Sequence, residues 1–386
     1  MTIETIKGFK DFIGEEAKKR EKIVEIIRKQ FRLYGFEPAE TPIIENEEFV
    51  TGENANDEAV RDIFRLKDRG KRELGLRYEF TFQLKRIAKN QKLPYKRYQI
   101  GYVFRDEPIK KGRSRQFIQC DADIIGSTTK DDAECLAMAY KIFSELKMPI
   151  KIYVNNRKLI NEILVAEKIE EKNRAQVIRE LDKLDKLSKV EVANNLKKYG
   201  AEKLLKIFGQ KEKEFEKYNF YNEIKELKKY CKLYDLEIEF RPFLARGLSY
   251  YNGNIFEVWS NDLNVSLAGG GSYLINDTQS TGISFGFEPI SLLAKVDDEK
   301  IKCQIISINQ DETAVKIAEK LRQKGTPIML MLDKTVSKAI EYANIKKVEK
   351  VIFIGAEEVK KKKFKVKDME NGKEEMLEIE EIIKLF

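Results

Sequence analysis

Two strand-like segments joined by a short basic loop constrain this chain more than any other feature. Apolar and aromatic residues occupy every second position in residues 97–105 and again in residues 116–125. This period of two is typical of β-strands. The loop between them, residues 106–115, contains a proline and a glycine. The pattern therefore predicts an antiparallel hairpin with one apolar face.

The other face of this hairpin carries Arg105, Gln119, Asp121 and Asp123, while Gly101 contributes no side chain. One interpretation is that this polar face simply meets water. The loop favours a second interpretation, because it contains four cations among ten residues and follows directly on a fifth, Arg105. Such a cluster suits phosphate groups.

Composition excludes several kinds of chemistry. The 386 residues include no histidine, so a histidine base, nucleophile or metal ligand is excluded. The four cysteines lie far apart and indicate reduced thiols rather than a metal site. Net charge is +8, which is compatible with a nucleic-acid partner. Without an apolar run long enough to span a bilayer, and with a polar beginning, the sequence predicts a cytoplasmic protein of two or three domains that does not bind a membrane.

The remaining segments predict a mixed α/β chain. Residues 15–34 show the apolar stripe of an amphipathic helix. Residues 74–90 read as a strand that runs into a helix, and Thr129 with Asp132 predicts a capping box. Residues 237–287 are again strand-like and are interrupted by the glycine-rich AGGGS.

Two further blocks stand apart. The Lys- and Glu-rich segment between Pro149 and Pro242 has no proline and helical periodicity. It predicts an inserted helical domain, which either pads the fold or meets a nucleic acid through its basic surface. After residue 300, short apolar strands alternate with helical segments, as in a small α/β domain that ends in a hairpin at Asn371–Gly372 and a last helix.

The order of motifs resembles that of a known family. VFRDEPIKKGRSRQFIQCDADIIG, residues 103–126, is similar to motif 2 of class II aminoacyl-tRNA synthetases in its histidyl form. KGFKDFIGEE resembles the family's opening segment and YGFEPAETPIIE its motif 1, with Pro42 at the dimer interface. LRYEFT resembles a substrate-binding strand and ARGLSYYNGNIFE the histidine-specific segment. The block after residue 300 resembles the anticodon-binding domain of these enzymes.

This resemblance implies a fold and a division of the chain. The fold is an α/β class II core, with an antiparallel sheet flanked by helices, a helical insertion and a C-terminal α/β anticodon-binding domain. The implied parts are core residues 1–150, insertion 151–236, core 237–297 and anticodon domain 298–386.

The resemblance also implies partners and roles. Histidine would be activated by ATP, with Mg²⁺ accompanying ATP and no metal held by the protein, and then transferred to tRNA(His) by a homodimer. The implied catalytic residues are Arg105 and Arg246. The implied ATP-binding residues are Arg105, Glu107 and Arg113. The implied histidine-binding residues are Glu79, Thr81, Arg105, Gln119, Asp123, Arg246, Tyr250 and Tyr251.

The chain departs from the family pattern at several positions. Ser249 stands where the family usually has aspartate, and Ser272 and Leu274 flank Tyr273 in place of the usual GGRYD residues. Pro289 replaces the ATP-binding arginine of motif 3. Two alternatives therefore stay open, namely the synthetase-like regulatory subunit of ATP phosphoribosyltransferase and a non-catalytic RNA-binding protein on a synthetase scaffold.

Overall fold

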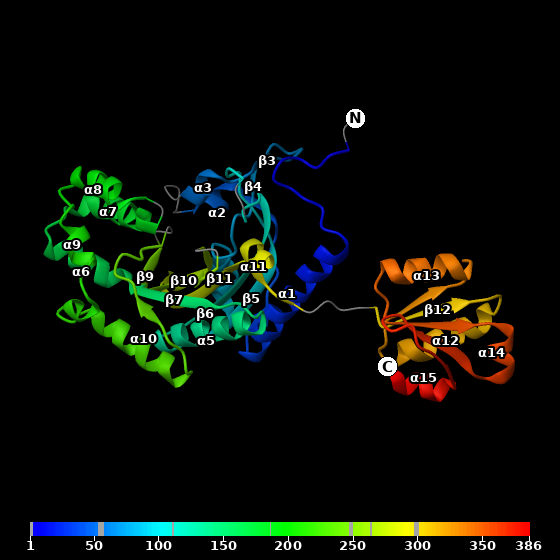
Figure 1. Cartoon of the computed structure of the whole chain (residues 1–386). Helices are drawn as coiled ribbons and strands as arrows, with labels where there is room; N and C mark the ends of the chain where they lie inside the picture. Colours follow the sequence, from blue (N-terminus) through cyan, green and yellow to red (C-terminus); the bar gives the residue numbers. More distant parts are fainter. Residues whose placement is uncertain are drawn as a thin grey trace. The chain divides into compact units, whose positions relative to one another are not determined.

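A computed structural model describes residues 3–52, 58–109, 112–185, 187–246, 250–262, 265–296 and 301–386. The chain forms two compact units, Met1–Val296 and Asp297–Phe386, and each is considered by itself (Figure 1). The finer division into four parts remains a prediction. Within the described ranges, every helix is too short or too polar to cross a membrane.

An eight-stranded sheet forms the centre of the first unit. The five pairings from β5 to β7 are antiparallel, whereas β1 and β8 pair in parallel at the two edges. The order across the sheet is β1 (Glu37–Pro38), β5 (Tyr95–Phe104), β6 (Gln116–Ile125), β11 (Thr278–Gly286), β10 (Ser266–Ile275), β9 (Tyr251–Ser260), β7 (Ile150–Asn156) and β8 (Glu239–Phe240). The predicted hairpin is confirmed, and its strands are β5 and β6.

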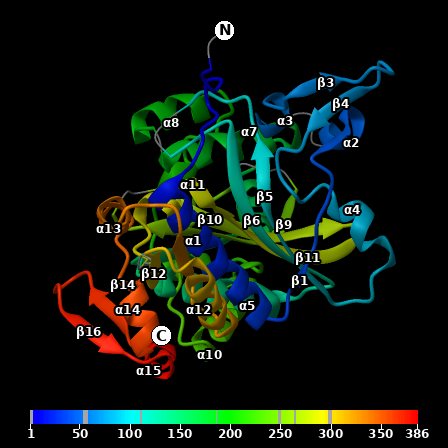
Figure 2. The same ribbon diagram turned by 90° about the vertical axis from the view of Figure 1, so that its right-hand side faces the viewer.

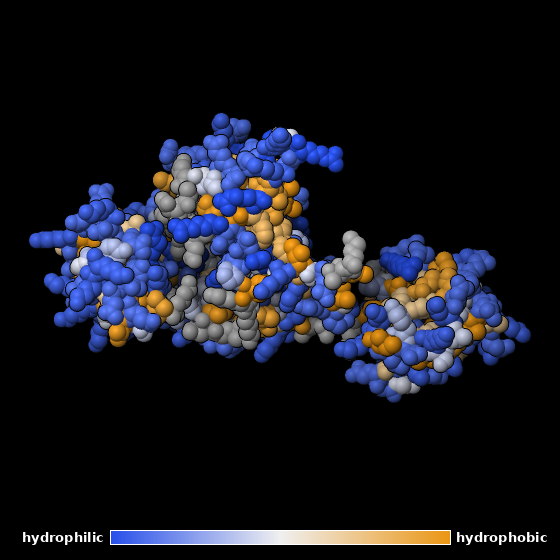
Figure 3. All heavy atoms as spheres, turned by 90° about the horizontal axis from the view of Figure 1, so that it is seen from above, coloured by the Kyte–Doolittle hydropathy of each residue, from blue (hydrophilic) through white to orange (hydrophobic). Residues whose placement is uncertain are grey.

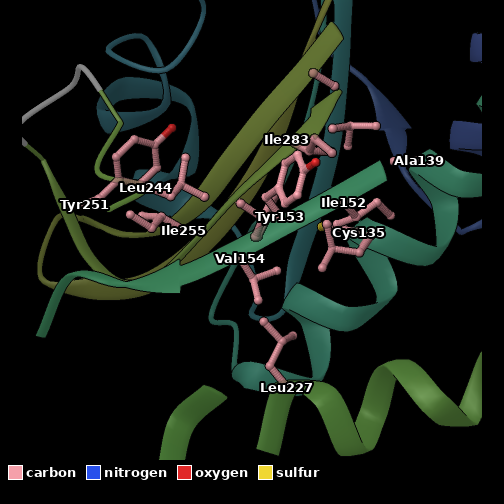
Figure 4. Packing of buried hydrophobic residues seen from close by; sticks show 14 of the residues in the cluster. Cys135, Ala139, Ile152, Tyr153, Val154, Leu227, Leu244, Tyr251, Ile255 and Ile283 are labelled. Carbon is pink, nitrogen blue, oxygen red and sulfur yellow. The ribbon is translucent and has the colours of Figure 1, made fainter. Parts of the chain in front are cut away.

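Helices cover the apolar face of this sheet. They are α1 (Gly14–Leu33), α5 (Thr129–Glu145) and α10 (Tyr221–Leu233). Figure 4 shows Cys135 of α5 close to Ile152 of β7, and Leu227 of α10 beneath Val154. Burial of these side chains leaves the opposite face of the central strands available for the polar residues.

The capping box of α5 lies one residue earlier than predicted. Thr128 is the N-cap, with extended backbone, and its hydroxyl and Asp131 form the box. Thr129 is instead the first helical residue. The sequence TTKDD contains two overlapping versions of the pattern, and only the backbone decides between them.

A second, three-stranded sheet packs beside the first. Its order is β2 (Ile44–Asn46), β4 (Glu73–Leu76) and β3 (Arg65–Lys67). The predicted strand running into a helix is only partly correct, because β4 ends at Leu76 and α4 (Leu84–Ile87) is a single turn followed by a 3-10 turn, Ala88–Asn90. Between them, the backbone of Arg77 bonds Ile43 and Phe104, and its side chain donates to the carbonyls of Thr41 and Tyr102. The short helices α2 (Glu47–Thr51) and α3 (Glu58–Arg61) lie next to this small sheet.

Helices between β7 and β8 match the expected helical character of the insertion. They are α6 (Arg157–Ala166), α7 (Glu171–Asp182), α8 (Lys189–Lys197), α9 (Leu204–Phe208) and α10, with 3-10 turns at Lys183–Asp185 and Glu212–Phe215. Figure 3 shows mostly hydrophilic side chains over this part of the face that it draws.

The second unit is a five-stranded sheet with helices on both faces (Figure 2). The strand order is β13 (Ile328–Met331), β12 (Cys303–Ser307), β14 (Lys350–Ile354), β15 (Phe364–Asp368) and β16 (Glu374–Leu377), the first three being parallel. The helices are α12 (Asp311–Gln323), α13 (Val336–Ile345), α14 (Ala356–Lys361) and α15 (Ile379–Leu385). The predicted alternation of strands and helices, the hairpin and the final helix are all confirmed.

Candidate active site

The register of the large sheet aligns a row of polar residues across five strands. Gln99 pairs with Asp121, Asp121 with Ser284, Ser284 with Gly269 and Gly269 with Glu257. Residues two apart on a strand share a face, so Gln119 and Asp123 lie on the same side. Asp121, Asp123 and Gln119 are only 3%, 4% and 5% exposed. The interpretation that this face simply meets water is therefore wrong.

A pocket of about 260 Å³ opens above this row. Five of the predicted residues line it, and they come from the hairpin, its loop and the segment before β9: Arg105, Glu107, Arg113, Gln119 and Arg246. Pro289 lines the same pocket. The other predicted residues, Glu79, Thr81, Asp123, Tyr250 and Tyr251, do not line it.

Arg105 is held at the end of a hydrogen-bonded chain. Its Nε donates to the carbonyl of Tyr78 at 3.1 Å, and a terminal nitrogen donates to Oε1 of Gln119 at 3.4 Å. The amide nitrogen of Gln119 in turn donates to Asp121 at 2.8 Å. Burial, followed by the charge of Asp123, raises the pKa of Asp121 to about 7.

Arg246 has a left-handed backbone conformation, which is rare for residues other than glycine. Its φ is +64°, in the left-handed region that side chains rarely adopt. Its guanidinium lies over Gly269, where a Cβ would approach one of its nitrogens to 2.3 Å. One terminal nitrogen pairs with Glu257 at 2.5 Å, and Tyr251 also hydrogen-bonds the side chain. The arginine is thereby fixed at the pocket wall.

The loop arginines are paired with carboxylates. Arg113 contacts Glu107 at 2.9 Å, and Arg115 contacts Asp106 at 2.9 Å. Gly112 approaches the helix α11 (Phe287–Leu293), since a Cβ on this glycine would lie 4.0 Å from Pro289. Lys110 and Lys111, which the sequence also places in this loop, lie outside the described residues.

Three tyrosines form a cluster beside the pocket, of which Tyr251 and Tyr273 are buried and Tyr250 is partly buried. The rings of Tyr250 and Tyr251 are 4.8 Å apart, and Tyr273 lies 5.5 Å from Tyr250. Thr81 hydrogen-bonds Tyr250. Burial raises the pKa of Tyr250, with the charge of Glu79 as the next cause. These contacts bring four of the predicted histidine-binding residues together.

Asp123 lies at the inner side of this cluster. The hydroxyl of Tyr273 donates to one of its oxygens, and Arg97 contacts the other at 2.8 Å. Gly282 makes room, because a Cβ there would lie 2.1 Å from the carboxylate. Burial raises the pKa of Asp123, and the charge of Arg97 opposes that shift. This carboxylate is buried with two partners already in place.

Tyr273 and Arg97 are residues of the site that the sequence did not point to. The expected interruption at AGGGS is wrong, because these residues form the interior of β10, where Tyr273 pairs with Tyr251. Arg97 is fully buried and pairs with Asp123 across the hairpin. The signal for Arg97 was the hairpin register itself, which places it opposite a carboxylate.

The residues that depart from the family pattern do not all lie at the pocket. Ser272 points away from the pocket and donates to Asp132 of α5 at 3.1 Å. Burial raises the pKa of Asp132 to about 6, although hydrogen bonds including that of Ser272 oppose the shift. Leu274 is half-exposed. Pro289 is the third residue of α11, and Ser249 lies outside the described residues.

Comparison with known proteins gives one consistent result. Residues 8–290 match the family model "Histidyl-tRNA synthetase", and residues 302–386 match the "Anticodon binding domain" model. Histidine–tRNA ligase 1 of Bacillus anthracis is 33% identical over 415 residues, covering 97% of each chain. Histidine–tRNA ligase of Methanococcus vannielii is 29% identical and covers 97% of this chain and 98% of its own.

Solved structures share the fold. The histidyl-tRNA synthetase of a Nostoc species superposes with a TM-score of 0.86 at 23% identity, with full coverage of both chains. A Bacillus halodurans protein, described as an ATP phosphoribosyltransferase regulatory subunit/histidyl-tRNA synthetase, has a TM-score of 0.77 at 21% identity and covers 92% of this chain and 98% of its own. By its family match and its similarity to curated relatives, the chain belongs to the histidyl-tRNA synthetase family.

Proposed function

We propose that this protein is a histidine–tRNA ligase. It activates L-histidine with ATP to give histidyl-adenylate and pyrophosphate, and then transfers histidine to the 3′ end of tRNA(His). One observation carries the proposal: Arg105 and Arg246 come from distant segments and line the same pocket as Glu107 and Arg113.

Activation requires a carboxylate to approach the α-phosphate, so two anions must be held together while negative charge develops. Arg105 bridges the histidine carboxylate and the α-phosphate, and Arg246 neutralises charge at that phosphate. Both arginines are held in position before substrate arrives, which is the arrangement that stabilises a transition state without reorganisation. The reaction needs positioning and electrostatics, and a chain without histidine can supply both.

Histidine is recognised at its two ends. Glu79, Thr81 and Gln119 accept hydrogen bonds from the α-ammonium group. Asp123 and Tyr251 bond the two imidazole nitrogens, and Tyr250 packs against the imidazole within the tyrosine cluster, beside the 260 Å³ pocket rather than in its wall. A carboxylate has about four acceptor positions, so Asp123 can accept from an imidazole N–H while Tyr273 still donates to it.

ATP is held by the motif 2 loop. Glu107 bonds the adenine edge and Arg113 meets the outer phosphates, after their mutual ion pair has opened. The described residues contain no group of three acidic or cysteine side chains placed to hold a metal ion. Glu288, another carboxylate that lines the pocket, is engaged bidentately by Arg20 at 2.8 and 2.9 Å. Mg²⁺ would be carried by the phosphates of ATP and would screen their charge there.

The tRNA and a second copy of the chain complete the proposal. The second unit matches an anticodon-binding model and serves as the site for the anticodon of tRNA(His). Next to Pro42, Ile43 and Ile44 are 43% and 50% exposed, and Leu66 of the same small sheet is 38% exposed. A homodimer through motif 1 would cover these apolar side chains.

The decisive experiment is ATP–pyrophosphate exchange with each amino acid in turn. Exchange with histidine alone supports the ligase, and charging of tRNA(His) tests the second step. The likeness to the Bacillus halodurans protein suggests a second candidate, a regulatory subunit of ATP phosphoribosyltransferase. No exchange with any amino acid, together with stimulation of ATP phosphoribosyltransferase, would favour that candidate.

A further inference from the structure

We propose that Glu257 and Trp259 form a positioning pair that fixes Arg246 for adenylate formation, and that Trp259 reports the state of this arginine. The inference rests on the proposed ligase function. It concerns two residues of β9 that lie beyond the substrate-binding set. Neither side chain is proposed to touch the reacting atoms.

Both oxygens of Glu257 are committed. Oε1 accepts from a terminal nitrogen of Arg246 at 2.5 Å, and Oε2 accepts from the indole N–H of Trp259 at 2.7 Å. Glu257 and Trp259 are two residues apart on one strand, so both side chains lie on the same face of the sheet. A carboxylate bonded at both oxygens cannot rotate without breaking one of the two hydrogen bonds.

The indole is itself held from the other side. The ring of Tyr153 meets it edge-on with centroids 6.4 Å apart, and the guanidinium of Arg241 lies 5.4 Å from its centroid. Arg241 also stacks on Tyr153 at 3.5 Å. Packed aromatic and cation–π contacts of this kind restrict the indole to one orientation. The carboxylate of Glu257 therefore receives a donor whose position is set by the body of the sheet.

The side chain of Arg246 shows why such support is needed. Its backbone has a positive φ, and the guanidinium lies over a glycine that offers no side chain to steer it. Its Nε is buried and has no hydrogen-bond partner among the described residues, so this donor is not used within the described part of the protein. Glu257 bonds a terminal nitrogen of the guanidinium and leaves the Nε donor unused.

Loss of this support should affect the rate more than the binding. Misplacement of a reacting or stabilising group by about 1 Å can cost ~100-fold in rate. Glu257→Gln keeps the size of the side chain but removes the charge that holds Arg246. Trp259→Phe removes the N–H donor and keeps an aromatic ring for Arg241 and Tyr153. We expect either variant to lower kcat for histidine-dependent exchange by ~10- to 100-fold, with the KM for ATP changed much less.

Trp259 is the only tryptophan in the chain, so its fluorescence gives a readout that does not depend on activity. Titration of the full-length protein with ATP should change the tryptophan emission saturably. The change should disappear in Glu257→Gln and in Arg246→Ala. Glu239→Gln, an exposed glutamate on the edge strand β8 of the same sheet, is the matched control and should leave both emission and exchange as in the parent.

The outcomes separate this inference from the proposed function. A parent protein that exchanges no amino acid, but whose ATP-dependent emission change is lost in Glu257→Gln, contradicts the ligase and supports the pair. An active parent with no change of emission on ATP binding overturns the pair. Unchanged kcat in both Glu257→Gln and Trp259→Phe, with unfolding temperatures equal to that of the parent, overturns it as well. A loss confined to stability would show that the two residues serve only the fold.

Discussion

Pro289 stands where the family has the motif 3 arginine that binds ATP. The site therefore needs another cation for the outer phosphates of ATP. Proline supplies neither a charge nor a backbone donor. As the third residue of α11 it lies in the first helical turn, where a missing N–H costs little. Because Pro289 and Arg113 line one pocket, we expect Arg113 to carry the phosphate contact that position 289 has lost.

The structure sets the size of the expected effect. Arg113 is 56% exposed in its pair with Glu107, and an exposed ion pair contributes roughly 0.2–1 kcal/mol. A hydrogen bond between an ionised pair typically contributes about 1.5–3 kcal/mol. When Arg113 leaves Glu107 and binds a phosphate of ATP instead, binding should gain about 1–2 kcal/mol. Arg113→Ala should therefore raise the KM for ATP by ~5- to 30-fold.

Pyrophosphate exchange with Arg113→Ala, Pro289→Arg and the double variant measures whether the two positions serve one phosphate. Pro289→Arg should recover part of the loss in Arg113→Ala, and the gain should be smaller when Arg113 is present. Arg69→Ala, an exposed arginine away from the pocket, controls for the change in net charge. Strict additivity of the two substitutions would refute a shared phosphate. A harmless Arg113→Ala in an active parent would place the compensating cation elsewhere.

Three further outcomes are expected. Asp123→Ala should raise the KM for histidine by ~10-fold or more, because an acceptor for one buried imidazole N–H is lost, and unchanged histidine affinity would contradict the pocket assignment. Deletion of residues 301–386 should impair charging of tRNA(His) far more than pyrophosphate exchange, because the pocket is lined by residues of the first unit. Equal losses in both assays from a folded truncation would argue against this division of roles. Asp121→Asn should gain stability relative to the parent as pH rises from about 4 to 7. In this window the unfolded carboxyl, with its ordinary pKa of 3.8, is ionised, whereas the folded one, with a pKa of about 7, keeps its proton, so only the parent loses stability. Chemical denaturation at both ends of the window measures the difference, and a difference independent of pH would show that Asp121 ionises normally.

Local patterns in the sequence predicted the main elements of the fold. The period of two in the hairpin placed β5 and β6 correctly, because the apolar side of each strand had to meet helices. The alternation of strands and helices after residue 300 was equally direct, since each strand of that unit is short and apolar. In both places local preference and burial point to the same structure.

Other features depended on backbone detail or on distant partners. The register of the α5 cap follows from the dihedral angles of Thr128, and the pattern TTKDD is compatible with two registers. The segment after β4 does not continue as a strand, and the side chain of Arg77 there binds carbonyls from two other segments, which no local pattern indicates. Tyr273 entered the site only through pairing of β10 with β9. Periodicity within one segment carries no information about which segments become neighbours.

The exposure of the ion pairs divides the site into a fixed part and a part that must rearrange. Arg246 and Glu257 are 20% and 12% exposed, so separation of this pair would leave charges with little water to solvate them. Arg113 is 56% exposed and can exchange Glu107 for a phosphate at small cost. The proposed reaction requires this difference: the arginine at the α-phosphate must be in place before charge develops there, whereas the loop must open to admit ATP. Since Arg113 and Arg246 are each neutralised by a carboxylate, the pocket can hold both cations before the substrate's negative charge arrives.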